Sequence, residues 1–202
     1  MICNTGFMGY RINIGVFGAQ GFIRAIFCDM WVSISFLVLS FILVLLYGGT
    51  FKKGIKKVLT IILLYALIFG VIFTVFNIPL PPLVLNILNY LSGGTIPIIM
   101  ISLGLSINLE GLYRNRNIVL GTIVKLVIFP IIVIILGILF GVAGLDFQVM
   151  VTQAAMPSGM MSLFLAINHK LDYRVTTDII FTNTLISLVT LPIIMYILIL
   201  LL

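Results

Sequence analysis

The sequence has few charged residues and few cysteines, and both shortages exclude classes of protein. Charged residues make up 8% of the 202 residues and hydrophobic residues 62%, whereas soluble domains have about 25% charged and about 45 to 50% apolar residues. Two cysteines, Cys3 and Cys28, are too few for a disulfide framework and lack the spacing of metal ligands. With a mean hydropathy of +1.36, the composition excludes a soluble domain and indicates a protein embedded in the lipid bilayer.

Residue types that carry catalysis or bind metals are also scarce. The one histidine, His169, falls in a polar stretch between apolar spans, where a solvated side chain is expected. No zinc cluster, phosphate-binding loop or serine nucleophile elbow is found. The net charge of +6 does not indicate nucleic acid, because the basic residues sit between apolar runs. We therefore expect no enzyme, no cofactor, no metal site and no nucleic-acid partner.

Long apolar stretches are abundant. A helix needs roughly 20 residues to cross a bilayer, and six stretches meet this length, while a seventh at the N-terminus is shorter and does not have the features of a signal peptide. The predicted fold is an all-α polytopic membrane protein of about seven transmembrane helices. The predicted spans are residues 1–17, 27–47, 58–76, 83–107, 118–142, 147–167 and 179–202.

Basic residues between the spans predict the orientation. Eight of them lie in alternate loops, and one, Arg24, lies on the opposite side. Because cytoplasmic loops carry the excess of lysine and arginine, we expect a multi-pass protein of the cell membrane with the C-terminus outside. The eight residues expected in the cytoplasm are Lys52, Lys53, Lys56, Lys57, Arg114, Arg116, Lys170 and Arg174.

The lysine-rich segment at residues 52–57 divides the chain, with two spans before it and five after it. A block of five spans is inverted when it is repeated, which is a common construction in secondary carriers. We predict part of a 5+5 inverted-repeat transporter fold. Residues 1–51 would be a two-helix remnant of the first repeat, residues 52–57 a cytoplasmic linker, and residues 58–202 the complete second repeat.

A helix breaker lies near the middle of the span at residues 147–167. Pro157 removes a backbone donor, and in hydrocarbon the freed groups must find a partner or line a wet cavity. A lone proline would be explained by packing, but Gln153 and Ser158 lie within a few residues and favour a site. The N-terminus of a half-helix suits a carboxylate, which predicts a small organic anion, although bare carbonyls could hold a cation.

Two further polar residues lie inside predicted spans. Lys125 is seven residues into the span at 118–142, where it could either snorkel to the interface or place its charge near the anion. We expect a kink in this helix at Pro130. Asn183, in the last span, is expected to form a hydrogen bond with the broken helix.

Two stretches of sequence carry a family resemblance. The first is Asn4-Thr5-Gly6-Phe7-Met8-Gly9, followed by Val16-Phe17-Gly18 and Gly21, and the second is Ala154-Ala155-Met156-Pro157, with Thr190-Leu191-Pro192 in the last span. Together they resemble the auxin efflux carrier family, which holds plant auxin exporters and bacterial permeases for malonate and malate. The resemblance covers essentially the whole chain and maps it onto the fourth to tenth helices of a ten-helix family.

The resemblance implies a secondary carrier that works by alternating access around two broken crossover helices, which cross near the midplane and bind an organic anion. The crossovers would be residues 1–17 and the Pro157 helix. This chain has Arg11 where the family usually has proline, so the first break would depend on Gly6 and Gly9. The predicted substrate-binding residues are Asn4, Gly6, Gly9, Arg11, Lys125, Gln153, Pro157, Ser158 and Asn183.

The chain also departs from the family at its start, since Met1 begins almost on the first motif. This indicates a truncated frame, a fragment or a split gene. The alternative function is therefore a non-transporting remnant, or a helical subunit that needs the missing N-terminal helices in trans. A coupling ion, either a proton or sodium, and a homodimer are left open. An anion channel is not favoured, because the spans offer no ring of charges.

Overall fold

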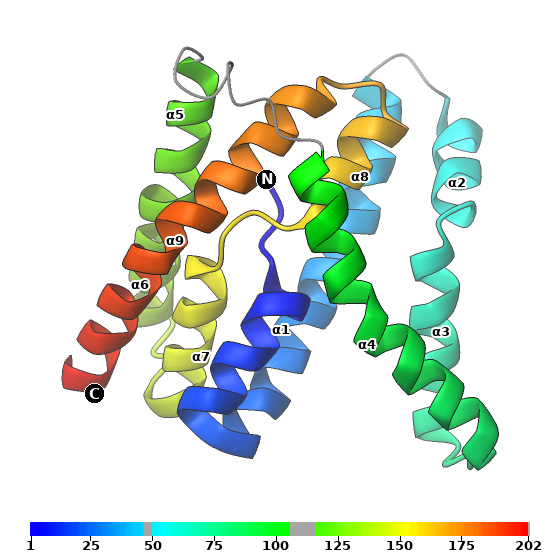
Figure 1. The fold of residues 1–202 in the computed structure, drawn as a ribbon, viewed down its shortest axis with the longest axis horizontal. Helices are drawn as coiled ribbons and strands as arrows, with labels where there is room; N and C mark the ends of the chain where they lie inside the picture. Colours follow the sequence, from blue (N-terminus) through cyan, green and yellow to red (C-terminus); the bar gives the residue numbers. More distant parts are fainter. Residues whose placement is uncertain (47–49, 106–115, 202) are drawn as a thin grey trace. The chain divides into compact units, whose positions relative to one another are not determined.

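The computed structural model describes residues 1–46, 50–105 and 116–201, and these residues are almost entirely helical (Figure 1). Within these ranges the sole extended pairing is an isolated bridge between Cys3 and Ser158. The chain divides into two compact units, Met1–Ser33 with Leu103–Leu202, and Ile34–Ser102. The predicted all-α class is confirmed for the described ranges.

The helices follow the apolar stretches of the sequence. They are α1 (Tyr10–Leu46), α2 (Phe51–Leu59), α3 (Ile62–Val75), α4 (Pro82–Leu105), α5 (Arg116–Ile123), α6 (Phe129–Leu139), α7 (Gly144–Ala155), α8 (Met160–Asn168) and α9 (Tyr173–Leu201), with π-helical turns η1 (Thr5–Gly9) before α1 and η2 (Val124–Ile128) between α5 and α6. Among the described residues, three helical stretches are long and apolar enough to cross a membrane: Thr5–Leu46, Arg116–Leu139 and Tyr173–Leu200. The count of seven spans and the inverted repeat stay predictions.

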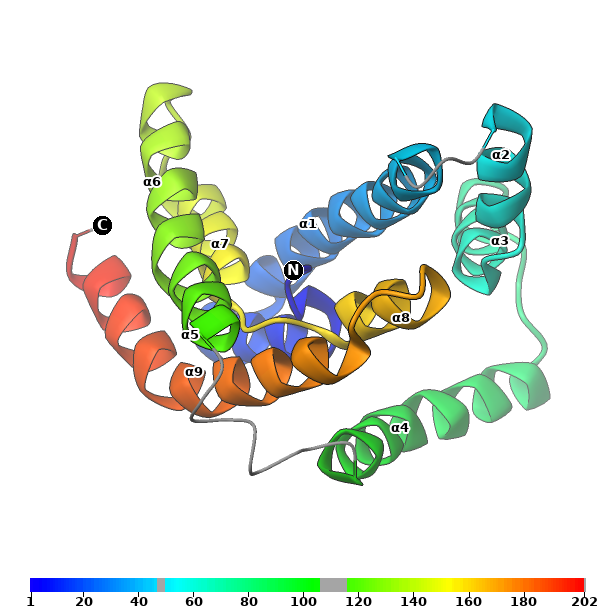
Figure 2. The same cartoon turned by 90° about the horizontal axis from the view of Figure 1, so that it is seen from above.

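Helix α1 consists of two limbs, residues 10–17 and residues 19–46, which are joined at Gly18. Gly18 has φ 65° and ψ −159°, a conformation open essentially to glycine alone. The chain turns back here, so that the first limb lies beside the start of the second (Figure 1 and Figure 2). The rings of Tyr10 and Phe22 meet edge to face with their centres 5.5 Å apart. The two limbs correspond to the first two predicted spans, residues 1–17 and 27–47.

The helices of the first unit pack around α7 and α9. Helix α7 contacts α6 and α9, and α9 also contacts α5 and α8. Phe147, Val151 and Leu198 form a buried cluster where α7 meets α9. The irregularity expected at Pro130 takes the form of the π-helical turn η2 directly before it. Pro130 itself stands in the first turn of α6, where its missing N–H is accommodated by the wider turn.

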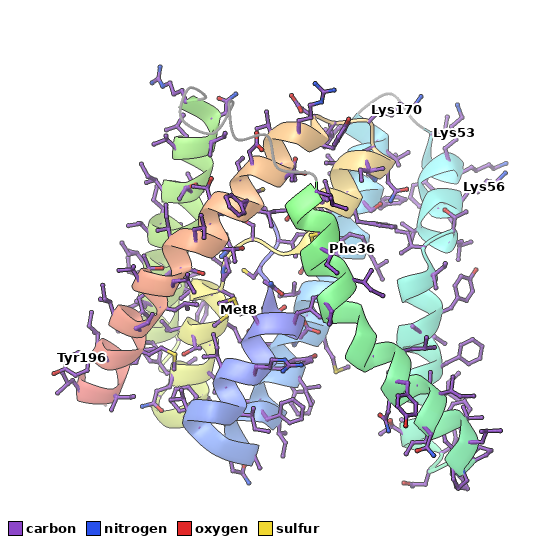
Figure 3. The ribbon with its side chains drawn as sticks, viewed as in Figure 1. Met8, Phe36, Lys53, Lys56, Lys170 and Tyr196 are labelled. Atoms are coloured by element: carbon purple, nitrogen blue, oxygen red, sulfur yellow. The ribbon has the colours of Figure 1, made fainter. Side chains whose placement is uncertain are left out.

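In the second unit, residues 52–57 lie within helix α2, where we expected a linker. Gly54 is buried against the ring of Phe41, which meets the Phe51 ring edge to face at 5.3 Å. Lys53 and Lys56 are exposed and point away from the helix (Figure 3). The helix is therefore amphipathic, and the division of the chain into repeats at this segment stays a prediction. An apolar groove beside α2 is lined by Leu37, Val38, Phe41, Ile55, Val58 and Leu59.

Gly137→Ala is expected to destabilise the first unit. A methyl group at this position would lie 2.7 Å from the Phe147 ring and 2.6 Å from the end of Met150, and overpacking a filled core costs about 1 to 3 kcal/mol. Gly15→Ala is the matched control, because nothing lies within 4 Å of the same methyl group there. Because alanine has a higher helix propensity than glycine, the free energy of unfolding of Gly15→Ala should equal that of the wild type or exceed it by up to about 1 kcal/mol. Thermal unfolding in detergent, followed by circular dichroism, measures both variants, and equal melting temperatures would contradict this packing.

Candidate functional site

Two extended segments cross in the first unit, residues 2–4 before η1 and residues 156–159 between α7 and α8. The N–H of Asn4 donates to the carbonyl oxygen of Pro157 over 2.8 Å, and the N–H of Gly159 donates to the carbonyl oxygen of Ile2 over 2.7 Å. Figure 1 shows the segment between α7 and α8 running across the N-terminal segment. Because backbone groups in hydrocarbon must be hydrogen-bonded, each break provides partners for the other.

Local sequence explains why the α7–α8 segment opens. Met156 has φ −57° and ψ 142°, as expected for a residue before proline, which is pushed out of the helical region. Gly159 allows the two backbones to approach, since a Cβ there would lie 3.1 Å from the Cα of Asn4. Met8, labelled in Figure 3, packs with Cys3 and Ile12 against buried α7 and α9 side chains. Apolar packing and backbone pairing therefore hold the crossing together.

Two helices begin at the crossing, one from each extended segment. The π-helical turn η1 starts at Thr5 directly after Asn4, and α8 starts at Met160 directly after Gly159. Neither helix start has a side-chain cap. The first amide groups of a helix have no partner within it and carry partial positive charge. The crossing is thus a place where an anion would be stabilised from two directions.

Lys125 of η2 brings a full positive charge to the crossing. Its side chain is 3% exposed, and its ammonium group donates to the carbonyl oxygen of Ala154, near the end of α7, over 2.9 Å. No carboxylate of the described ranges forms an ion pair with it. Of the two positions considered from the sequence, the buried one is found, and an ammonium group with three donors can still bind a ligand.

Hydroxyl and amide side chains line the two segments. The side-chain amide of Asn183 donates to the hydroxyl oxygen of Ser158 over 2.8 Å, and both residues are fully buried. This is the hydrogen bond expected between the last span and the broken helix. On the other segment, the N–H of Ile2 donates to the hydroxyl oxygen of Ser162 over 2.7 Å. Because Ser158 accepts from Asn183, its own hydroxyl hydrogen can point to a ligand.

Gln153 joins α7 to η1 and to the second limb of α1. Its amide nitrogen donates to the carbonyl oxygen of Ala25 over 3.3 Å. Its amide oxygen is buried without a hydrogen-bond partner and lies against Gly9, where a Cβ would come within 2.1 Å of it. Asn13 contacts the same glycine, since its amide nitrogen donates to the Gly9 carbonyl oxygen over 2.7 Å. Gly9 is therefore needed for close packing.

Asp29 lies beside the start of η1, although sequence reasoning did not single it out. The hydroxyls of Thr5 and Tyr10 donate to its carboxylate, the second over 2.7 Å. Since Thr5 follows Asn4, the carboxylate is held next to the first extended segment. An acidic residue inside the apolar stretch at 27–47 was the available signal, because charges at membrane depth are rare and usually functional.

The structure brings most of the predicted residues together. Asn4, Pro157 and Ser158 form the crossing, and Gly9, Lys125, Gln153 and Asn183 surround it, as described above. Gly6 follows Asn4 by two residues, and a Cβ added to it would lie 3.5 Å from the Asp29 carboxylate. Arg11 is exposed and is not brought to the group. The part of these residues in binding a substrate stays a prediction.

One prediction about the first crossover is wrong. The break does not depend on Gly6 and Gly9, because both glycines lie inside the π-helical turn η1. The chain is extended earlier, at residues 2–4, where it pairs with the Pro157 segment. The partner segment therefore determines where the first helix begins. As for metals, the described part of the chain contains no group of three or more His, Cys, Asp or Glu side chains.

Comparison with known proteins identifies the family. A family model described as "Membrane transport protein" matches residues 52–195. An uncharacterized transporter from Methanothermobacter thermautotrophicus is 36% identical over 192 residues, which are 94% of this chain and 63% of that protein. An uncharacterized transporter from Methanocaldococcus jannaschii is 34% identical over 193 residues, 93% of this chain and 63% of that protein. The chain thus spans less than two thirds of the length of these relatives.

The matched range of the family model includes the motif around Pro157 that was noted in the sequence. The apolar helices and the transporter names of the relatives also agree with a protein that crosses the membrane several times. The chain belongs to the membrane transport protein family of the auxin efflux carriers.

Proposed function

We propose that this protein acts in a secondary carrier that moves a small organic anion by alternating access around the crossing. One observation carries the proposal: the buried ammonium group of Lys125 donates to the carbonyl oxygen of Ala154, two residues before the segment at residues 156–159 that leads into α8. The first unit, which holds both broken segments, would carry the anion. The lysine-rich helix α2 would face the cytoplasm.

The charges around the crossing favour an anion over a cation. A carboxylate could accept from the ammonium group of Lys125, from the hydroxyl of Ser158 and from amide groups at the start of α8. Charge-assisted hydrogen bonds of this kind are shorter and about twice as strong as neutral ones. Since Lys125 has a carbonyl oxygen and no carboxylate as its hydrogen-bond acceptor, an arriving anion supplies the missing negative charge. Asn4 and Gly9 would shape the site through the backbone.

Lys125→Met is expected to reduce anion uptake by purified protein in liposomes. Hydrogen bonds to charged groups contribute about 1.5 to 3 kcal/mol, and about 1.4 kcal/mol is a factor of ten, so initial rates of malonate or indole-3-acetate uptake should fall about tenfold or more. Lys53→Met, at an exposed lysine of α2, is the matched control and should keep the wild-type rate. The proposal fails if neither anion enters wild-type vesicles faster than empty ones, or if the two variants transport equally.

Anion binding should also be visible without transport. Malonate or indole-3-acetate should raise the melting temperature of the protein in detergent, whereas the corresponding neutral amides should not. A ligand at 100 times its dissociation constant stabilises the folded state by about 2.7 kcal/mol. Each amide matches its acid in size, so the comparison isolates the charge. Equal shifts from acid and amide would argue against an anion site.

A further inference from the structure

We propose that Asp29 is the residue at which the carrier takes up a coupling proton. The proposal deepens the proposed function and rests on it, because it assigns the cation that accompanies the organic anion. It stands on the position of the carboxylate beside the crossing and on the groups that hold it there.

Both oxygens of the Asp29 carboxylate are engaged by residues near the start of the first crossover. The hydroxyl of Thr5 donates to Oδ1, and the hydroxyl of Tyr10 donates to Oδ2 over 2.7 Å. Thr5 is 2% exposed and directly follows Asn4, whose N–H donates to the carbonyl oxygen of Pro157. A change at the carboxylate therefore reaches the crossing through one peptide unit.

Among the residues that the structure describes, no positive side chain forms an ion pair with Asp29. In the ranges that the structure describes, Arg24 on the same limb is paired with Asp146 of α7. Lys125 is held by the carbonyl oxygen of Ala154 and does not pair with Asp29. A charge at membrane depth without a counter-charge is expensive, and such residues mark ion and proton pathways.

The other titratable groups around Asp29 are few. From the first limb, the phenol of Tyr10 faces the carboxylate. On its own limb the neighbour is Cys28, whose thiol is influenced electrostatically by both Asp29 and Asp146. From α7, the neutral side chain of Gln153 bonds to the backbone one turn before Asp29. The carboxylate is thus the group in this cluster that can take up a proton.

The geometry favours a proton over a sodium ion. Thr5 and Tyr10 direct hydrogens, not lone pairs, at the carboxylate, whereas a metal ion needs oxygen lone pairs on all sides. A proton from water would add to one carboxylate oxygen and change the charge of Asp29 from −1 to zero. That oxygen would become a donor, and the hydroxyl that had donated to it would turn to accept.

Protonation of Asp29 also removes a negative charge from beside the anion site. The organic anion and the proton therefore help each other to bind, and this coupling is reciprocal. An anion bound at Lys125 must then increase proton uptake at Asp29. This reciprocal effect separates a coupling site from an isolated buried acid.

Infrared difference spectroscopy tests the proposal on the purified chain in lipid nanodiscs. On acidification, a carbonyl-stretching band of a protonated carboxyl group should appear, should be missing in Asp29→Asn and should return in Asp29→Glu. Asp146→Asn, at an exposed carboxylate, is the matched control and should keep the band. The assignment is overturned if Asp29→Asn keeps the band and Asp178→Asn, at a buried aspartate of α9, removes it.

A second variant covers the case in which Asp29→Asn does not fold. Tyr10→Phe removes one hydroxyl that bonds to the carboxylate and should shift the frequency of the same band. A band that does not respond to this change does not come from Asp29, and the proposal then fails.

The coupling is read at fixed pH by adding malonate, which should increase the Asp29 band in the wild type and not in Lys125→Met. If malonate stabilises the wild-type protein but does not increase the Asp29 band, the proposed coupling is wrong. A band that depends on Asp29 in a protein that neither binds nor transports anions would keep the proton site and reject the proposed carrier. The two proposals can therefore fail separately.

Discussion

Backbone groups inside a bilayer must be hydrogen-bonded, and the candidate site depends on how this chain meets that requirement. Residues 2–4 and 156–159 both leave the helical conformation, and each would alone expose amide and carbonyl groups to hydrocarbon. An unpaired polar group costs about 2 to 7 kcal/mol when it is buried without a partner. The two segments pair with each other through Asn4 and Gly159, so each break is stable because the other is present.

Two groups of opposite charge lie around the crossing, and among the described residues they form no ion pair with each other. Lys125 is held by a backbone carbonyl oxygen, and Asp29 is held by two hydroxyls. Had they formed an ion pair, neither would be free for an ion from outside. Kept apart, the ammonium group suits an organic anion and the carboxylate suits a proton. The proposed carrier and the proposed proton site thus follow from a single arrangement.

Part of this arrangement could be predicted from the sequence, and part could not. The break at Pro157 is local, because proline removes a donor and restricts its neighbour wherever it stands. The opening at residues 2–4 has no such signal, since it is imposed by a segment more than 150 positions away. The burial of Lys125 was undecided, because a lysine stem is long enough to reach either water or the site. Asp29 was overlooked inside an apolar stretch. Its carboxylate is bound by Thr5 and Tyr10, and these residues approach it only because the chain reverses at Gly18.

The most direct test of the crossing is a disulfide between its two segments. Cys3 and Ser158 face each other in an antiparallel pair flanked by hydrogen bonds, where Cα atoms lie about 4.5 Å apart and within the range of a disulfide. In a Cys28→Ser background, Ser158→Cys should form a disulfide with Cys3 on mild oxidation, as read by mass spectrometry of peptides. Leu139→Cys, an exposed position at the far end of α6, should not. Absence of the Cys3 link in Ser158→Cys, or equal yields from both variants, would contradict the crossing.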